Sequence, residues 1–340
     1  MDTPHTNDST TPGTAAASPA AAVKALARDV GYVDCGICGV EPFAEDRAAL
    51  AERMARFPDA AHLYEGMTAR CDPTATAPWA RALVVCVRWY GKYRLPPGLD
   101  GIIGKNYLGD RRIAPCPDHT MPSRMKAGLR DLGLRAKRIS LPDRWAGVRA
   151  GVVRLGRNCF AYAGDHGSWI NLESWAVDAE LPHDEPTPEP PCPEGCRACL
   201  QACPTKALVE PFCMRMDRCI PWLTYRAPEP VAPALWDAMG GWIYGCDVCQ
   251  DVCPLNQGAW RELEPAPWLE EAADSLTPEA LAQMDQQTYE AVVHPLFWYI
   301  PTDRLDRWHR NARRALEQRR GTRNQPSTPT AQDHDAPPQT

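Results

Sequence analysis

The cysteines of this chain are concentrated in two short blocks, and their spacing limits what this part of the chain can fold into. The first block reads CPEGCRACLQACP and runs from Cys192 to Pro204. The second block reads CDVCQDVCP and runs from Cys246 to Pro254, with Cys219 upstream of it. A stretch this dense in cysteine has little apolar material for a core, so we expect the metal bound by its thiols to hold it together.

The spacing within the blocks indicates which metal they bind. Apart from one extra residue after Cys192, the first block follows the C-x2-C-x2-C-x3-C-P run that binds [4Fe–4S] clusters in bacterial ferredoxins, where the cysteine before proline ligates the other cluster. The sequence therefore predicts two clusters with crossed ligation. Cluster one takes Cys192, Cys196, Cys199 and Cys253. Cluster two takes Cys203, Cys219, Cys246 and Cys249. Four-thiolate zinc is the alternative, but zinc pairs rarely show C-x2-C-x3-C-P twice with this crossing.

The remaining cysteines give no metal-binding pattern of this strength. The chain has 15 cysteines and no secretory signal at its start, which argues against a disulfide scaffold. Cys35 and Cys38 form a C-x-x-C, but strand alternation would point them away from a common metal, so core packing is favoured over ligation. Packing is also expected for Cys71, Cys86, Cys116, Cys159 and Cys213.

Length and composition indicate a multi-unit protein outside the membrane. At ~100–200 residues per domain, 340 residues suggest two folded units, and 44% hydrophobic residues can bury a core. No apolar run approaches the ~18–20 residues that span a bilayer. The net charge of −6 gives no global attraction to nucleic acid. We expect a cytoplasmic protein.

The order of predicted elements divides the chain. We expect helices near 22–30, 45–57, 122–132, 278–284 and 302–319, and strands at 32–40 and 82–89, the last a short apolar run bounded by turn signals. Their alternation predicts an α/β fold in the first unit. The expected division is a disordered leader at 1–22, an α/β unit at 23–181, a ferredoxin-like double-cluster domain at 182–260 entered through a proline-rich linker, a C-terminal helical segment at 261–320 and a disordered tail at 321–340.

Several segments resemble the epoxyqueuosine reductases, cobalamin-dependent iron–sulfur enzymes that act in tRNA queuosine biosynthesis and are related to reductive dehalogenases. The clearest are RCIPWLT from Arg218 and GCDVCQDVCPLN from Gly245. AGVVRLGRNCFAYAGDHGSW from Ala150 and the Arg310-Asn311-Ala312 triplet are also similar to family segments. The resemblance covers roughly 23–316. It implies a cobalamin-binding-like α/β N-terminal domain beside the clusters.

The resemblance also implies roles for individual residues. Asn158, Ala161, Ser168 and Leu172 are expected to line the corrin, and Asp247 to lie at the junction between cluster two and the corrin. Turn chemistry is the alternative interpretation for Asn158 and Ser168, and ordinary packing is the alternative for the two apolar residues.

The chain departs from the family around the expected substrate pocket. The family aspartate that is thought to donate a proton is absent. Counting back without gaps from Gly151 places Lys137 there, and Asp143-Arg144 falls where the family has Glu-Arg. Burial could lower the pKa of Lys137 enough for proton donation; the alternative is a solvated surface lysine. The loop from Gly101 to Met121 offers further candidate donors, namely Tyr107, Asp110 and His119.

Three functions remain open on this sequence. The first is a cobalamin-dependent oxidoreductase that reduces epoxyqueuosine in tRNA, with electrons from an external flavodoxin-type or ferredoxin-type donor. The second is a cobalamin-dependent reductase of a small molecule, and the third is a ferredoxin-like electron carrier without cobalamin. The arginine-rich segment 304–320 is either a solvated helix face or a phosphate-binding patch for tRNA.

Overall fold

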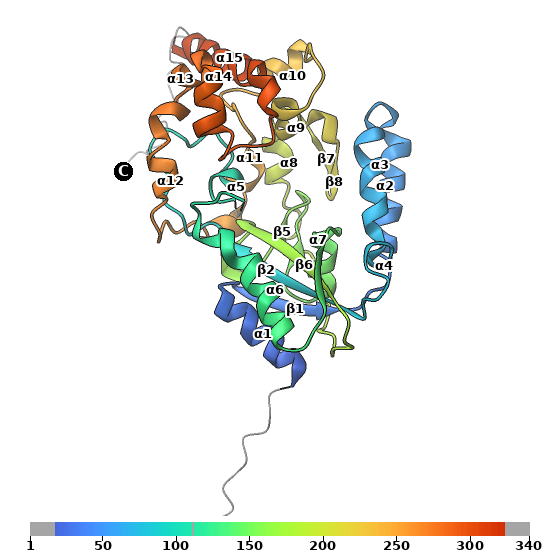
Figure 1. Ribbon diagram of the computed structural model, residues 1–340. Helices are drawn as coiled ribbons and strands as arrows, with labels where there is room; N and C mark the ends of the chain where they lie inside the picture. The colour runs from blue at the N-terminus through green and yellow to red at the C-terminus, as the bar shows by residue number, and fades with distance from the viewer. Residues whose placement is uncertain (1–17, 111, 324–340) are drawn as a thin grey trace, which may run out of the picture.

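A four-stranded antiparallel sheet lies at the centre of the first unit (Figure 1). The computed structural model describes residues 18–110 and 112–323. The strand order is β1-β2-β6-β3, and every neighbouring pair is antiparallel. The strands are β1 (Asp34–Cys38), β2 (Ala82–Trp89), β3 (Ala136–Ile139) and β6 (Ile170–Val177). Every residue of β2 is buried because helices and loops cover both faces of this central strand.

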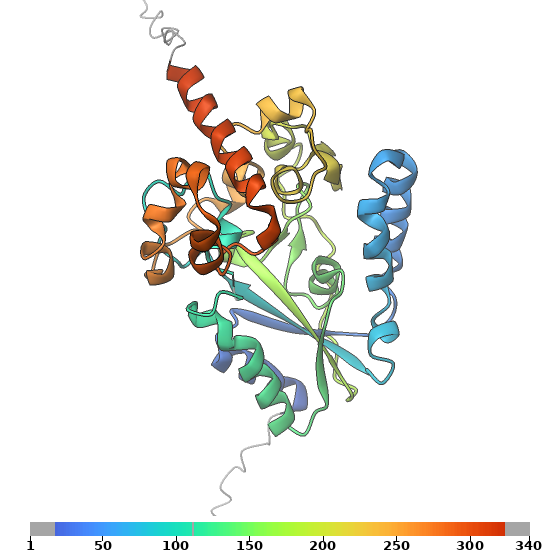
Figure 2. The same ribbon diagram turned by 45° about the horizontal axis from the view of Figure 1, so that its top comes forward.

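Each face of the sheet has its own apolar cluster. On one face, α1 (Pro19–Val30) and α6 (Met121–Asp131) bury Val23 and Met125 against the strands. On the other face lie α7 (Asp143–Arg149) and the pair α2 (Ala44–Arg56) and α3 (His62–Thr68), as Figure 2 shows. Cys35 belongs to the first cluster and Cys38 to the second. The prediction that strand alternation separates these two thiols is confirmed.

The cysteine-rich module lies beyond one end of this sheet and has few apolar residues of its own. Its elements are α8 (Ala198–Ala202), β7 (Leu208–Glu210), β8 (Cys213–Met214), α9 (Ile220–Tyr225), α10 (Pro233–Ala238) and α11 (Val248–Asp251). Its two apolar clusters are small: five buried residues around α8, two of them cysteines, and five around α9 and α10. A core this small leaves the module dependent on what its thiols bind.

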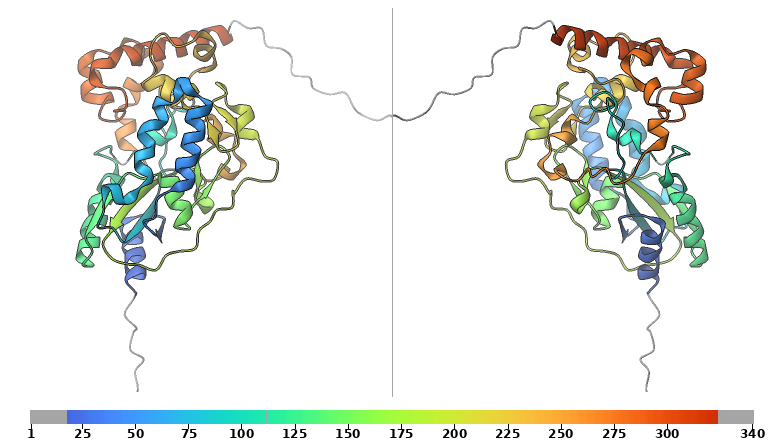
Figure 3. Two further views of the ribbon diagram at one scale, coloured as in Figure 1. Left: turned by 90° about the vertical axis from the view of Figure 1, so that its right-hand side faces the viewer. Right: turned by 90° about the vertical axis from the view of Figure 1, so that its left-hand side faces the viewer.

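The proline-rich linker into this module contains no helix or strand, as expected, and runs along the side of the molecule (Figure 3). It is nevertheless held to the first unit. Asp184 donates its backbone N–H to Ile37 O at 2.9 Å and accepts the Ile37 N–H at 2.8 Å. Asp184 also pairs with Lys24 at 2.5 Å.

The C-terminal helices share their core with a loop from the first unit. The helices are α12 (Pro267–Glu270), α13 (Pro278–Gln283), α14 (Gln286–Thr288) and α15 (Leu305–Arg323). Leu99, Ile103 and Ile113 pack into the same apolar cluster as Trp308. The sequence-based division assigned this loop, which includes α5 (Lys105–Leu108), to the first unit. Its packing groups the loop with the C-terminal helices, because apolar side chains join whichever core they reach in space.

The expected elements are confirmed, with two corrections at the ends of the chain. The strand at Ala82–Trp89 and the helices near 45–57, 122–132 and 278–284 are present within one or two residues of their predicted bounds. The predicted leader is too long, because α1 begins at Pro19 with Ser18 accepting the Ala21 N–H at 3.2 Å. The predicted tail begins too early, since α15 continues to Arg323. Residues 1–17 and 324–340 lie outside the described part.

The described residues, 18–110 and 112–323, contain no helix whose length and apolar character would let it cross a membrane.

The smaller elements include α4 (Pro73–Thr76), β4 (Arg154–Leu155) and β5 (Ala161–Tyr162). The β4–β5 hairpin connects the sheet to the cysteine-rich module, and its residues begin the candidate site.

Candidate functional site

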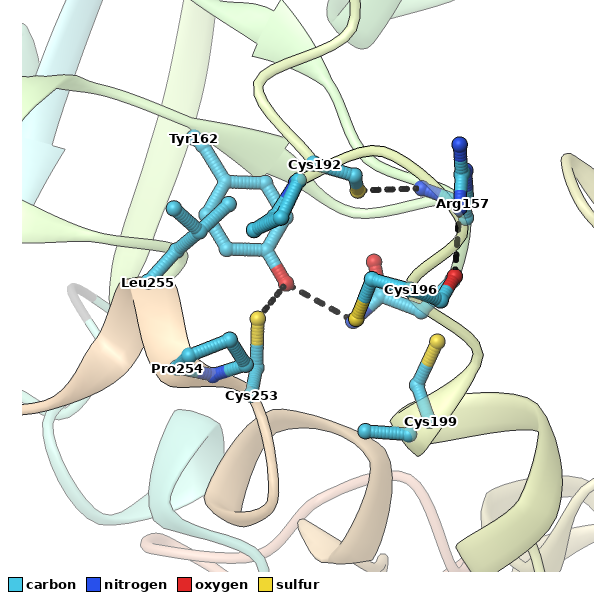
Figure 4. Close-up of a pocket in the computed structure, with 11 residues that line it drawn as sticks. Arg157, Tyr162, Cys192, Cys196, Cys199, Cys253, Pro254 and Leu255 are labelled. Atoms are coloured by element: carbon cyan, nitrogen blue, oxygen red, sulfur yellow. Dashed lines mark hydrogen bonds between the residues drawn. The ribbon is translucent and has the colours of Figure 1, made fainter.

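The four cysteines predicted for cluster one surround a narrow pocket of about 10 Å³ (Figure 4). Cys196 lies just before α8 and Cys199 within it, whereas Cys253 follows α11 and comes from the second block. Cys192 completes the set from the end of the linker. The fold thus brings together the two distant stretches that crossed ligation requires.

Hydrogen bonds from the first unit reach the sulfurs of this pocket. The backbone N–H of Arg157 donates to Cys192 Sγ at 3.3 Å, and the Tyr162 hydroxyl donates to Cys253 Sγ at 3.2 Å. The Arg157 side chain donates to the Cys196 carbonyl at 2.5 Å. Hydrogen bonds to cluster sulfurs are one of the factors that set the reduction potential, so the β4–β5 hairpin can tune this site.

The four cysteines predicted for cluster two line a much larger cavity of about 660 Å³. Cys203 follows α8 and Cys219 precedes α9. Cys246 lies just before α11, and Cys249 lies within it. Burial raises the pKa of Cys219 to about 12. A thiolate is favourable in such surroundings only when a metal compensates for its desolvation.

The spacing of the sulfurs differs from that of a single-ion site. Among residues 18–110 and 112–323, no group of three or more His, Cys, Asp or Glu side chains lies close enough to share one metal ion. The four irons of a cubane separate its thiolate ligands more widely than one ion does. The two cysteine sets therefore lack the compact arrangement of a single-ion tetrahedral site.

The first unit forms the opposite wall of the large cavity. Three of the residues expected at the corrin, Asn158, Ala161 and Leu172, line it together with Asp247. Asn158 also lines the small pocket, so it lies between the two cysteine sets. Its Nδ2 donates to the Tyr162 hydroxyl at 2.9 Å and to the Cys249 carbonyl at 3.1 Å. Its Oδ1 accepts the Phe160 N–H, which is the turn chemistry named as the alternative.

Asp247 is buried and lines the cavity on the side that the second cysteine block forms. Its Oδ2 accepts the backbone N–H of Lys105 at 2.8 Å, which attaches the block to the loop that contains α5. Burial raises the pKa of Asp247 to about 7, and the Lys105 hydrogen bond partly opposes that rise. Asp247 thus lies beside the second cysteine set and lines the cavity, and its place at a junction between cluster two and a corrin stays a prediction.

Ser168 requires a correction, because it is absent from the cavity lining and joins the two units instead. Its hydroxyl accepts from Gln250 Nε2 at 2.9 Å and from Asn256 Nδ2 at 2.8 Å, and its N–H donates to Asn256 Oδ1 at 2.8 Å. The preceding Gly167 has φ 56°, and a Cβ there would lie 2.3 Å from Asn256 Oδ1. Only glycine permits this approach.

Lys137 also requires a correction. It lies on β3, where its side chain is exposed and Nζ donates to the Thr76 carbonyl at 3.1 Å. It is not among the cavity-lining residues, and neither is the exposed His119. The gap-free count from Gly151 placed Lys137 at the position of the family aspartate. In the structure β3 pairs with the C-terminal half of β6, from Ser174 to Val177, so Lys137 lies away from the cavity. Lys137 is the solvated lysine of the alternative interpretation.

Tyr107 and Asp110 do line the cavity, but their surroundings differ from those of a free proton donor. Burial raises the pKa of Tyr107, which keeps its hydroxyl protonated. Burial also raises the pKa of Asp110, but hydrogen bonds from Arg112 outweigh it, so that this pKa is lower than usual. Arg112 donates three of them, from its N–H and Nε at 2.9 Å and from Nη2 at 2.6 Å. Asp110 is therefore a carboxylate at neutral pH.

Sequence reasoning missed Asp143, the first residue of α7, which also lines the cavity. Its Oδ1 accepts from the Ser174 hydroxyl at 2.7 Å. Burial raises the pKa of Asp143 to about 6, against the lowering influence of Ser174 and Arg144. The available signal was its place at the family's Glu-Arg pair, since a carboxylate occurs there in both.

The arginine-rich helix α15 is neither a solvated face nor a phosphate-binding patch along its whole length, because several of its arginines are engaged within the protein. Arg307 and Arg314 are buried, and with Arg310 they donate to backbone carbonyls: Arg307 to Tyr225 O at 2.6 Å, Arg310 to Leu223 O at 3.0 Å, and Arg314 to Gly240 O and Trp242 O. Asn311 of the triplet donates to Thr224 O and Ile243 O, both at 3.0 Å. Arg313 and Arg320 are exposed.

The fold and the two cysteine sets define a class of protein: an iron–sulfur protein with a double-cluster domain joined to an α/β unit. Residues 192–256 match the family described as the 4Fe–4S double cluster binding domain. The two predicted [4Fe–4S] clusters are thereby confirmed as the cofactors of this domain.

The particular fold is that of epoxyqueuosine reductase. The epoxyqueuosine reductase from Streptococcus thermophilus superposes with a TM-score of 0.73 at 20% identity, covering 87% of this chain and 80% of that one. A crystal structure of epoxyqueuosine reductase with an epoxyqueuosine-modified tRNA-Tyr stem loop gives 0.69 at 24% identity over the same shares. The predicted fold class is confirmed.

Curated relatives extend the resemblance in sequence. The epoxyqueuosine reductase of Synechocystis sp. is 41% identical over 114 residues, 33% of this chain and 38% of that enzyme. The enzyme of Cellulophaga algicola is 25% identical over 256 residues, 72% of this chain and 81% of that one. The more identical matches thus span less than half of the curated relatives. The resemblance inferred from the motifs is confirmed.

Proposed function

We propose that this chain is a cobalamin-dependent iron–sulfur oxidoreductase of the epoxyqueuosine reductase type, which reduces epoxyqueuosine in tRNA to queuosine. One observation carries the proposal: the second cysteine set opens on a 660 Å³ cavity whose opposite wall is the α/β unit. A pure electron carrier needs no such cavity beside its cluster, whereas a reductase needs space there for a cofactor and a substrate.

The cysteine sets divide the proposed electron path. Cys192, Cys196, Cys199 and Cys253 hold cluster one, and Cys203, Cys219, Cys246 and Cys249 hold cluster two. Cluster two faces the cavity and is the immediate donor to it, while Asn158 contacts the surroundings of both. An external flavodoxin-type or ferredoxin-type protein supplies the electrons one at a time.

The cavity lining fits cobalamin. Ala161, Ile170 and Leu172 offer an apolar surface to a corrin face, and Asn106, Asn171 and Thr205 offer polar groups to its amide-bearing edge. When bound and reduced, cobalamin supplies a strongly nucleophilic, low-potential metal centre. The protein's own contribution is to hold that group between cluster two and the substrate and to exclude water.

The tRNA part of the proposal depends on the exposed end of α15 and on the cavity entrance. Arg313 and Arg320 are exposed on that helix, while Arg70 and Arg144 line the cavity without a hydrogen bond or ion pair to the other described residues. These four cations can meet phosphates. A tRNA substrate places the protein in the cytoplasm.

One observation favours the small-molecule alternative. Three α15 arginines are engaged with backbone carbonyls, which reduces the cationic surface available to RNA. The same cavity would then admit a small substrate that is reduced beside cluster two.

The test is anaerobic isolation followed by metal analysis and turnover. We expect ~8 iron atoms per chain from two cubanes and one cobalt after reconstitution with cobalamin. An epoxyqueuosine-modified tRNA stem loop should then be converted to the queuosine form with dithionite as reductant. Iron without cobalt would support the carrier. Cobalt without conversion of the stem loop would support the small-molecule reductase.

A further inference from the structure

The proposed reduction needs protons as well as electrons. Converting an epoxide to an alkene breaks two C–O bonds, consumes two electrons and two protons, and releases the oxygen as water. The external low-potential donor supplies the electrons through the clusters. The protons must reach the leaving oxygen inside the cavity, so a protonated side chain in its wall is required.

Among residues 18–110 and 112–323, three carboxyl groups line the cavity: Asp110, Asp143 and Asp247. Asp110 accepts three hydrogen bonds from Arg112, which favour its charged form. Asp247 lies between two of the proposed cluster ligands and accepts the Lys105 N–H. Both groups are engaged in holding the loop that contains α5 and the second cysteine block in place.

Asp143 is placed differently from the other two. Its Oδ1 accepts from Ser174 Oγ at 2.7 Å, and no hydrogen bond or ion pair with another described residue engages its Oδ2. Ser174 is buried on β6 and held by pairing with β2 and β3, so it fixes the carboxyl group on a rigid strand. Leu172, one strand repeat earlier, also lines the cavity.

We infer that Asp143 donates a proton to the oxygen that leaves the substrate, and that Ser174 positions its carboxyl group. This inference rests on the proposed function. The Asp143 O–H bond breaks as the proton passes to the leaving oxygen, and the carboxylate that forms is reprotonated from solvent. The second proton reaches the oxygen from water.

The charges near Asp143 suit this cycle. Arg144 is its neighbour in α7, and Arg70 comes from the turn after α3; both lower its pKa and stabilise the carboxylate once the proton has left. Glu173, on the opposite face of β6, raises the pKa and accepts from the Tyr32 hydroxyl at 2.8 Å. Burial outweighs these charges and raises the pKa of Asp143 to about 6. About one Asp143 in ten is then protonated at pH 7.

The sign of the pH dependence follows from the protonated form being the active one. Turnover should be highest below pH 6 and fall about tenfold per pH unit above it. The hydrogen bond from Ser174 favours the charged form of Asp143 and lowers its pKa. Ser174→Ala should therefore move the point at which turnover falls to higher pH.

The experiment compares the anaerobic, reconstituted wild-type protein with Asp143→Asn, Ser174→Ala and Lys137→Ala. Asp143→Asn should lower single turnover of the epoxyqueuosine stem loop about 10²-fold or more, the lower end of general-acid contributions. Binding of cobalamin and stem loop, and the dithionite reduction of clusters and cobalamin followed by visible absorption, should be unchanged. Lys137→Ala, whose side chain is exposed, is the control and should turn over like wild type.

Infrared spectra recorded across pH give a readout independent of turnover. The wild-type protein should show a protonated-carboxyl band that disappears near pH 6, and Asp143→Asn should lack it. Unchanged turnover in Asp143→Asn, or no such band in the wild type, overturns the inference. If the wild-type protein binds cobalt but leaves the stem loop unchanged, the proposed function fails, and the infrared band alone then decides whether Asp143 holds the proton.

Discussion

The two cysteine blocks share the spacing C-x2-C-x3-C-P, yet the surroundings of the two cysteine sets differ greatly. The set with Cys192 encloses about 10 Å³ and is contacted by the β4–β5 hairpin, whereas the set with Cys203 opens on about 660 Å³. Local spacing therefore predicts that a cubane binds, but the rest of the fold decides which cysteine set borders the large cavity. One site is enclosed, and the other borders the cavity in which we propose that the substrate is reduced.

The largest effect should come from removing a ligand that joins the two blocks. Cys253→Ala should lower iron from ~8 to ~4 atoms per chain or fewer, because each cubane binds through four thiolates, and should abolish turnover. Iron analysis and electron paramagnetic resonance of reduced protein provide the measurement. Cys213→Ala, a buried cysteine of the same module outside both sets, should keep its iron. Loss of iron in both variants would contradict the assignment.

A smaller effect is expected where the first unit holds the second block. Ser168→Ala removes the hydroxyl that accepts from Gln250 Nε2 and Asn256 Nδ2, each of which keeps a backbone carbonyl as partner, so the loss should be about 0.5–1.5 kcal/mol per hydrogen bond. The free energy of unfolding of the anaerobic holoprotein, measured with denaturant, should fall by that order. The exposed Ser140→Ala is the matched control and should change it by less than about 0.5 kcal/mol. Equal losses of unfolding free energy in the two variants would contradict the role of Ser168 in joining the two units.

The next effect concerns RNA outside the cavity. Replacing both Arg313 and Arg320 by Ala should weaken stem-loop binding and lower the slope of log affinity against log salt by about 2, one for each lost phosphate contact. The double change of Arg28 and Arg130, two exposed arginines on the far helices α1 and α6, is the control. An unchanged slope would place RNA contacts at the cavity entrance alone.

The smallest effect should distinguish the two clusters directly. Tyr162→Phe removes the hydroxyl that donates to Cys253 Sγ at 3.2 Å. Losing a hydrogen bond to a ligand sulfur disfavours the more negative reduced cluster, so one of the two reduction potentials should fall while the other stays. An anaerobic redox titration would show this. Tyr64→Phe, whose hydroxyl donates to the Met214 carbonyl, is the control. Equal shifts of both potentials would contradict the separation of the sites.

Much of the fold could be read from local patterns. The buried run at Ala82–Trp89 predicted β2 to the residue, and helical spacing located α2, α6 and α13. The loop near Ile103 was assigned to the wrong unit, because its apolar side chains find partners near Trp308, some two hundred residues away. Patterns within one segment carry no information about such a distant partner.

The residues of the candidate site were also predicted only in part from the sequence. Asn158, Ala161, Leu172 and Asp247 line the cavity, and their contact with a corrin stays a prediction. Ser168 instead serves to join the units, and Lys137 lies outside on β3. Asp143 was passed over because its importance depends on Ser174 and on burial, neither of which is visible in its sequence neighbourhood.

The sequence by itself determined the chemistry of the metal sites, because thiolates a few residues apart face one cubane through the turn they share. The tertiary structure alone decided which carboxyl groups face the cavity and in what surroundings. A cavity is bounded by segments from Arg70 to Tyr299, and the pKa of a carboxyl group is set by the burial and charges that those segments bring to it.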